Sequence, residues 1–190
     1  VLPALERLAL YESDAGTEGV QRLAAGLGAG ALPAVTGIYL VSMHVGDAGA
    51  SALAAALGRG ALPRLKTLSL YSTAIGDAGL VALAPALRQL PALEKLSLEC
   101  SSFGVEGLAA LVAPPPPAGA LPPPTGVLTK LKLLNLGNTQ ITDAGCATLA
   151  AALNSGTLSL LERLYLFGLP ASATAKAAVG RAGLEVFTEM

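Results

Sequence analysis

Apolar residues recur in one short pattern along nearly the whole chain. The pattern Leu-x-x-Leu-x-Leu, with Val or Ile replacing Leu in one unit, begins at residues 5, 35, 65, 93, 131 and 161. Successive starts are separated by 30, 30, 28, 38 and 30 residues. The alternation of apolar positions at the end of the pattern is typical of a half-buried strand. The nearly constant spacing predicts about six repeats of one structural unit.

A helical pattern follows the strand in the best-preserved units. Residues 45–57, 75–87 and 141–153 read VGDAGASALAAAL, IGDAGLVALAPAL and ITDAGCATLAAAL. Each segment ends with two leucines four residues apart, which lie on one face of a helix. We therefore expect close-packed positions in the first helical turn at Gly49, Gly79 and Gly145, and helix ends at Gly58, Gly60 and Gly156.

An acidic residue stands at the start of each of these helical segments. Asp47, Asp77 and Asp143 occupy one repeat position, and Asp14 is the fourth aspartate of the chain. A carboxylate at a helix start can accept hydrogen bonds from the first free N–H groups and interacts favourably with the positive helix end. The pattern therefore predicts that these aspartates are structural caps.

Each unit is thus predicted to be a strand, a turn, a helix and a return loop. One such unit cannot cover its own apolar faces, whereas stacked units can. We predict a single domain over residues 1–190. Its fold class is α/β, a right-handed αβ solenoid with a parallel sheet on the concave face and helices on the convex face.

The fourth and last units depart from this pattern. The helical segment GLAALV at 107–112 is followed by a proline-rich stretch, and proline cannot continue a helix. We interpret residues 113–126 as an insertion loop. It is either an inert surface segment or a polyproline ligand for proline-reading domains. Residues 172–190 are predicted to hold a C-terminal helix, near 172–182, and a short closing strand around Leu184 and Phe187.

The units resemble leucine-rich repeats of the ribonuclease-inhibitor-like class over residues 1 to about 170. The resemblance implies a horseshoe-shaped fold that binds proteins without catalysis. That class usually has Asn or Cys three residues after the third leucine. The corresponding residues here are Ser13, Met43, Thr73, Ser101, Thr139 and Leu169. The hydroxyl groups among them can still bond to the turn backbone, whereas Met43 and Leu169 cannot do so in the same way.

Composition narrows the class of partner. The chain has a formal net charge of −1 and no basic stripe along the sequence, which argues against nucleic-acid binding. The charge-free stretches 23–46 and 107–129 are interrupted by Gly and Pro and do not predict a membrane span. Cys100 and Cys146 are too few and too far apart for a disulfide framework, so we expect an intracellular, cytoplasmic protein.

No motif predicts catalysis, a cofactor, a metal or a small-molecule substrate. The segment LGNTQITDAG could be read as a phosphate-binding turn, but it lacks both glycine-rich signatures. It also recurs in other units, each with an acid that would repel phosphate. The lone His44 is expected to face solvent in a turn. The two cysteines lack metal-ligand spacing and are expected to be inert thiols.

The candidate binding residues lie beside the leucines of the Leu-x-x-Leu-x-Leu pattern, which we call the first, second and third framework leucines of each unit. Strand side chains alternate, so if the second and third leucines face the core, their neighbours face the concave side. All four tyrosines of the chain fall in that set. Tyr and Arg are enriched in binding hot spots, although Tyr also favours strands for its own sake. The predicted protein-binding residues are Arg7, Tyr11, Tyr39, Tyr71, Lys95, Glu99, Arg163, Tyr165 and Phe167. In the unit starting at 131, Leu133, Asn135 and Gly137 are expected to leave room rather than supply an anchor.

The favoured function is therefore non-catalytic binding of an unidentified protein partner. Three alternatives stay open. The chain could be the sensing array of a larger nucleotide-binding leucine-rich-repeat receptor, since VLPAL at its start resembles the return loop ALPRL. It could be a regulator similar to Ran GTPase-activating protein, which shares this repeat class. It could also be a purely structural segment.

Overall fold

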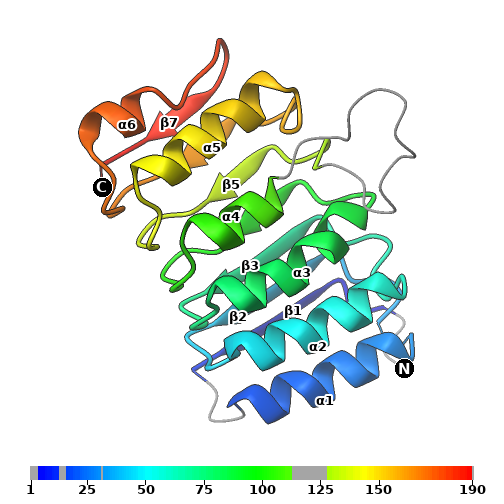
Figure 1. Cartoon of the computed structure of the whole chain (residues 1–190). Helices are drawn as coiled ribbons and strands as arrows, with labels where there is room; N and C mark the ends of the chain where they lie inside the picture. The colour runs from blue at the N-terminus through cyan, green and yellow to red at the C-terminus, as the bar shows by residue number, and fades with distance from the viewer. Residues whose placement is uncertain (1–3, 13–15, 31, 113–127, 190) are drawn as a thin grey trace, which may run out of the picture.

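The computed structural model describes residues 4–12, 16–30, 32–112 and 128–189 (Figure 1). Strands and helices alternate along these residues. The strands are β1 (Arg7–Tyr11), β2 (Gly37–Val41), β3 (Thr67–Tyr71), β4 (Lys95–Ser97), β5 (Leu133–Asn135), β6 (Arg163–Tyr165) and β7 (Glu185–Phe187). The helices are α1 (Gly16–Gly28), α2 (Gly46–Gly58), α3 (Asp77–Gln89), α4 (Val105–Leu111), α5 (Asp143–Asn154) and α6 (Ala173–Ala177). The predicted insertion at 113–126 lies outside the described residues.

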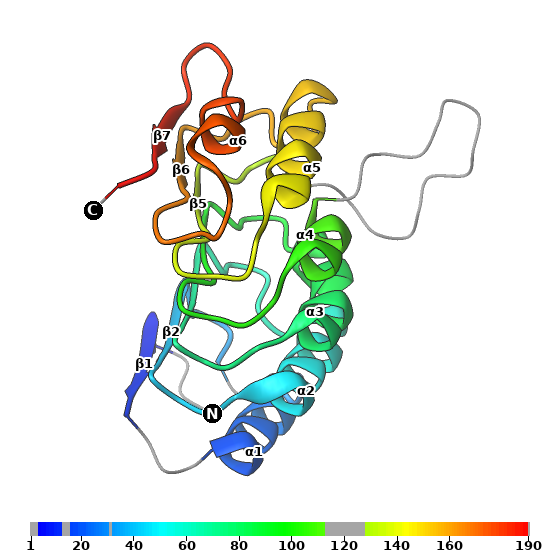
Figure 2. The ribbon, with the colours of Figure 1, turned by 60° about the vertical axis from the view of Figure 1, so that its left-hand side comes forward.

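The strands form one parallel sheet in the order β1-β2-β3-β4-β5-β6-β7. Equivalent residues of successive units are paired, so that Arg7 lies opposite Gly37 and Lys95 lies opposite Leu133. Figure 2 shows the helices as a layer on one side of the sheet, and the other face carries no helix. The predicted αβ solenoid is confirmed. We call the face without helices the open sheet face.

The core lies between the sheet and the helices. Its largest contribution comes from the framework leucines, since Leu40, Leu70, Leu98 and Leu136 are fully buried. Burying one such side chain contributes about 1.5–3 kcal/mol before the entropic cost of ordering it. In β1, which has a strand on one side only, Leu8 and Leu10 are half-buried. Lateral stacking of units therefore completes the core, as the sequence pattern predicted.

A left-handed residue ends each strand at the same repeat position. Ser42, Ser72, Cys100 and Asn138 have φ of 52°, 53°, 56° and 53°. The N–H of Ser42 donates to the carbonyl of Tyr71, and the N–H of Ser72 donates to that of Glu99, at 2.9 Å each. The residue therefore turns the chain away from the sheet while keeping a hydrogen bond to the next unit.

Threonine hydroxyls stabilise two of these turns in place of asparagine. Thr73 Oγ1 donates to the carbonyl of Leu70 at 2.9 Å, and Thr139 Oγ1 donates to that of Leu136 at 2.8 Å. This confirms that hydroxyl groups bond to the turn backbone in these units. Met43 is buried at the corresponding place in its unit and makes an apolar contribution there.

The conserved-looking aspartates do not cap their own helices, and that prediction is wrong. Asp47 Oδ1 accepts from Gly76 N–H at 2.7 Å, and Asp77 Oδ1 accepts from the N–H groups of Gly104 and Gly107 at 2.8 and 2.7 Å. Each acceptor belongs to one unit and each donor to the next. The reason is position, because Asp77 and Asp143 are the first helical residues, and their side chains project towards the neighbouring helix start.

The same link joins the last two helices. Asp143 accepts from the Ser172 backbone N–H at 2.6 Å and from its hydroxyl at 2.9 Å. Both bonds lower the pKa of Asp143, and the bond from the backbone N–H has the larger effect. Folding therefore favours the charged form of this carboxyl. Each aspartate thus supplies from the preceding unit the acceptor that an N-cap side chain would normally provide.

Glycines in the first helical turn make room for these carboxylates. A Cβ atom on Gly79 would lie 2.5 Å from Asp47 Oδ1, and one on Gly107 would lie 2.9 Å from Asp77 Oδ1. The predicted close packing at Gly49, Gly79 and Gly145 is confirmed. At Gly49 and Gly145, however, the nearest neighbours are the side chains of Val45 and Ile141 and not a carboxylate. The fourth unit has Val105 where the second, third and fifth units have Asp, so no carboxylate of that position links α4 to α5.

Replacing Asp77 by alanine should therefore lower the free energy of unfolding by about 1.5 kcal/mol, because it leaves two backbone donors of α4 without their acceptor. Urea unfolding followed by circular dichroism measures the effect. Glu106→Ala is the matched control, since Glu106 is an exposed acid in the first turn of the same helix. Its cost should stay near 0.5 kcal/mol. Equal costs for both variants would show that general helix-dipole electrostatics explain the effect.

Candidate protein-binding face

The open sheet face presents three rows of side chains. They are defined by the residue before the second framework leucine, the residue between the second and third, and the residue after the third. The first row is Arg7, Gly37, Thr67, Lys95, Leu133, Arg163 and Glu185. The second is Ala9, Tyr39, Ser69, Ser97, Asn135, Tyr165 and Phe187. The third is Tyr11, Val41, Tyr71, Glu99, Gly137 and Phe167.

All nine predicted binding residues belong to these rows, but they differ in accessibility. Arg7, Lys95 and Arg163 are exposed, and Tyr11 is the most accessible aromatic, with 63% of its surface exposed. Of the remaining predicted residues, Tyr39, Tyr71, Glu99 and Tyr165 are half-buried. The face therefore offers three separate basic groups and tyrosine rings that are partly supported by their neighbours.

Phe167 is covered rather than presented. Only 7% of it is exposed, and its ring occupies the space above Gly137, where a Cβ atom would lie 2.5 Å from the ring. Tyr39 uses the same device, because its ring lies 3.0 Å from the place of a Cβ on Gly37. The space expected at Gly137 is therefore already filled by the Phe167 ring of the next unit. Phe167 packs within the open sheet face and is not accessible to a partner.

An aromatic cluster forms at the C-terminal end of the sheet. The rings of Tyr165 and Phe187 are stacked, with centroids 4.6 Å apart and an interplanar angle of 11°. Phe167 meets Tyr165 edge-on at 6.4 Å and 81°. Phe187 is 37% exposed and was not among the predicted binding residues. A closing strand was expected there, but with Leu184 and Phe187 at its first two framework positions, which would have turned Phe187 towards the core. That register is wrong by one residue, because Val186 pairs with Leu164 and Phe187 pairs with Tyr165.

Polar contacts hold the third row in the middle of the sheet. Asn135 Nδ2 donates to Glu99 Oε2 at 2.7 Å, and the Gly137 N–H donates to Asn135 Oδ1 at 3.0 Å. A hydrogen bond to the Cys100 side chain, together with the negative charge that Cys100 and Glu99 can carry, raises the pKa of Tyr71. Tyr71 is therefore a neutral phenol at physiological pH and can donate a hydrogen bond to a partner.

A hollow of about 540 Å³ lies beside this row, at the turns that follow the strands. It is lined by Ser42, Ser72, Cys100, Ser101, Asn138 and Gln140, and more of its surface is apolar than polar. His44 also borders it and is exposed, as predicted for a turn residue. Among the described residues that line the hollow, none is a carboxylate.

The two cysteines have different surroundings. Cys100 is half-buried in the turn after β4, and Cys146 is buried in α5. Burial raises the pKa of Cys146, with the Asp143 charge acting in the same direction, so its thiol stays protonated and poorly nucleophilic. Within the described ranges, no three His, Cys, Asp or Glu side chains gather as metal ligands would, and no helix is long and apolar enough to cross a membrane.

The family model described as Leucine Rich repeat matches residues 62–84 and 127–150. The first segment contains β3 and part of α3, and the second contains β5 and part of α5. Both matches thus fall on the strand-to-helix unit that the parallel sheet repeats. Two units of the chain thus match the leucine-rich repeat model. No curated protein matches the sequence.

The other units share the register of the two matched ones, since β1, β2, β4 and β6 continue the same paired rows. Proteins built from such repeats are typically non-catalytic scaffolds that bind other proteins across the repeated surface.

Proposed function

We propose that this protein is a non-catalytic leucine-rich repeat scaffold that binds another protein through the open sheet face. The observation that carries the proposal is the placement of all four tyrosines of the chain on that face, beside exposed Arg7, Lys95 and Arg163. Tyrosine and arginine are enriched among the few residues that carry most of the binding energy of protein interfaces, because they combine large contact area with hydrogen bonding.

The roles divide by accessibility. Tyr11, Tyr39, Tyr71 and Tyr165 act as aromatic anchors. Exposed Phe187 extends that set, and buried Phe167 holds Tyr165 in place through their edge-on contact. Arg7, Lys95, Glu99 and Arg163 set the register of the partner through charge. Glu99 is already oriented by Asn135, which reduces the entropic cost of using it.

We assign the repeats to the ribonuclease-inhibitor-like class and place the protein in the cytoplasm. Units of about 30 residues, each with a helix behind the sheet, support the class. The intracellular location is supported by Cys100 and Cys146, which are both free thiols.

The double substitution Tyr39→Ala with Tyr71→Ala tests the proposal. We expect the dissociation constant for the partner protein to rise by roughly 100-fold. Removing one anchor from an interface centre costs about 2 kcal/mol, and two anchors that share one site cost less together than the sum of the two. Isothermal titration calorimetry gives the constant, and circular dichroism verifies that the variant is folded. The control is Val81→Ala, which trims an exposed apolar side chain on α3, away from the sheet. Unchanged affinity in the folded double variant would refute binding through this face.

A further inference from the structure

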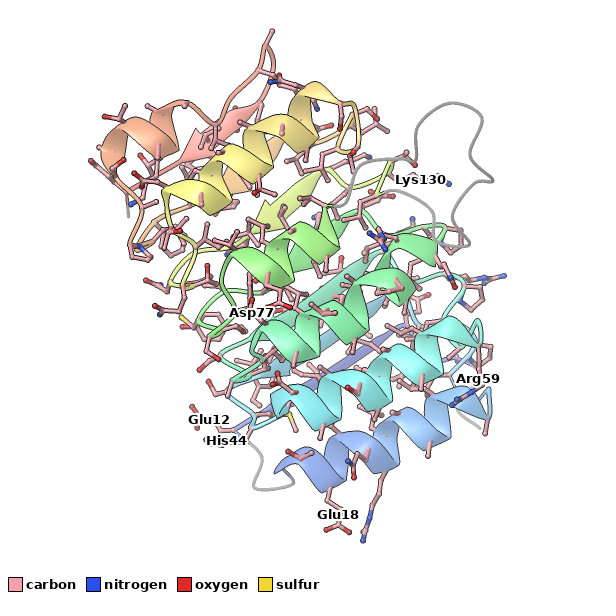
Figure 3. All side chains as sticks on the ribbon, in the orientation of Figure 1. Glu12, Glu18, His44, Arg59, Asp77 and Lys130 are labelled. Atoms are coloured by element: carbon pink, nitrogen blue, oxygen red, sulfur yellow. The ribbon has the colours of Figure 1, made fainter. Side chains whose placement is uncertain are left out.

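Folding of this nearly neutral chain gathers most of its bases at one edge of the sheet and several of its acids at the opposite edge, although Glu94 and Glu162 lie among the bases. We call these edges the strand-start edge, where strands begin and helices end, and the strand-end edge, where strands end and helices begin. Figure 3 shows Arg59 and Lys130 at the first edge and Glu12 at the opposite one. The strand-end edge also holds Asp47, Asp77, Glu99, Glu106 and Asp143. No stripe is visible in the sequence because these positions recur about 30 residues apart.

Some of these charges complement the partial charges at the helix ends. All helices run the same way, so their positive ends meet the acids and their negative ends meet the bases. Arg88 Nη1 donates to the carbonyl of Ala110 at 2.7 Å, near the end of α4. Arg181 donates to the carbonyls of Leu158, Ser159 and Leu161 at 2.9, 2.7 and 3.0 Å. These two arginines therefore have structural roles, and their charges are already engaged.

A second group of bases at the strand-start edge is not explained in this way. This group, which we call the basic strip, consists of Arg64, Lys66, Lys95, Lys130, Lys132 and Arg163. All six are exposed, and they span four consecutive units from β3 to β6. Within the described residues their ion pairs are Lys132 with Glu94 at 3.3 Å and Arg163 with Glu185 at 3.4 Å. The remaining charge faces solvent beside the first row of the open sheet face.

The strip has an internal order. Backbone hydrogen bonds connect Lys66, Glu94, Lys132 and Glu162 as successive neighbours, at 2.8, 2.8 and 2.9 Å. Residues of alternating charge therefore follow one another along this line at the backbone spacing of neighbouring strands, about 4.8 Å. Lys95 lies one residue further into the sheet, and Arg64 and Lys130 lie two residues before the line. A partner must then bring separated negative groups, because a continuous polyanion would also meet Glu94 and Glu162.

We propose that the basic strip binds an acidic segment of the partner protein, lying across the strand-start edge of units three to six. The segment's carboxylates pair with Lys66, Lys95 and Lys130, and its backbone runs perpendicular to the strands towards the tyrosines. Exposed ion pairs are individually weak, so the strip chiefly speeds association and selects acidic partners. The inference rests on the proposed function, because it names the chemistry of that partner.

The test uses a fluorescein-labelled peptide of alternating glutamate and glycine, with a serine–glycine peptide as its neutral counterpart. Fluorescence anisotropy is measured on the full chain at low and high salt. The acidic peptide should bind at low salt and lose affinity as salt rises, whereas the neutral one should not bind. In Lys95→Glu with Lys130→Glu, binding should weaken by roughly tenfold or more.

The matched control is Arg22→Glu with Lys176→Glu, which changes the net charge equally but away from the strip. It should bind the acidic peptide as the unaltered protein does. Equal weakening in both doubles would overturn the proposal, because net charge alone would explain the binding. Tighter binding of single-stranded DNA than of the acidic peptide would also overturn it, as would salt-sensitive self-association that excludes the peptide.

Loss of partner binding in the Tyr39→Ala with Tyr71→Ala variant, with peptide binding intact, would support both proposals independently. Peptide that never binds, with tyrosine-dependent partner binding intact, would refute only the acidic strip.

Discussion

Replacing Phe103 by alanine should lower the free energy of unfolding by about 3–5 kcal/mol, the largest effect expected in this protein. Phe103 is fully buried and occupies the repeat position of Val45, Ile75 and Ile141, which are also buried. Its unit has Val105 in place of the linking aspartate, so the junction between α4 and α5 depends more on apolar packing than the others do. Removing the ring leaves a cavity in that junction, which denaturant unfolding will register as a lower midpoint.

Two further variants locate the cause of that loss. Phe103→Ile restores the residue of the third and fifth units and should cost about 1–1.5 kcal/mol, because it fills most of the volume. Leu160→Ala removes an exposed apolar side chain and should change stability by less than about 0.5 kcal/mol. If Phe103→Ala proved as mild as Leu160→Ala, the ring would not be part of the packed core.

Replacing Gly79 by alanine should lower the free energy of unfolding by about 2.5 kcal/mol, although alanine is the better helix former. A Cβ atom there would lie 2.5 Å from Asp47 Oδ1 and 2.9 Å from the Asp47 Cα, so both a side chain and a backbone would have to move. The hydrogen bond from Gly76 to Asp47 would be lost or stretched in the process. Thermal and urea unfolding of the variant measure the combined cost.

Gly26→Ala is the same substitution in an open helical position. No atom lies within 4 Å of the place where its Cβ would stand, so the helix-propensity gain of about 0.5–1 kcal/mol should appear as added stability. Opposite signs at Gly79 and Gly26 are therefore expected. Stabilisation at both positions would contradict the close packing of α2 against α3. Adding Asp47→Ala to Gly79→Ala should not restore full stability, because the backbone contact remains.

The repeat pattern was sufficient to predict the strands, the helices and their stacking. Leucines such as Leu40 and Leu70 are predictable because burial of one face imposes a period on the sequence. The aspartates were assigned to the wrong helix for a related reason. A carboxylate at a helix start has a well-known local acceptor role, and only the lateral offset of neighbouring units shows that the donors belong to the next repeat.

The candidate binding face was predictable in outline but not in accessibility. Alternation alone put Tyr39, Tyr165 and Phe167 on one face. It could not show that Phe167 lies over Gly137 and is thereby buried, since those residues are 30 positions apart. Phe187 was missed for another reason, because the sequence pattern put it at a core-facing position of the closing strand, whereas Val186 takes that position beside Leu164.

The sequence by itself determined the unit, the direction of its apolar side and the identity of the residues on the open sheet face. These properties are periodic, and each follows from residues close together in the chain. The tertiary structure decided which helix each aspartate serves, which aromatic rings remain accessible, and that most of the scattered bases and several of the acids gather at opposite edges. Those properties depend on contacts between units, and the stacking distance of the strands converts a separation of 30 residues into direct neighbours.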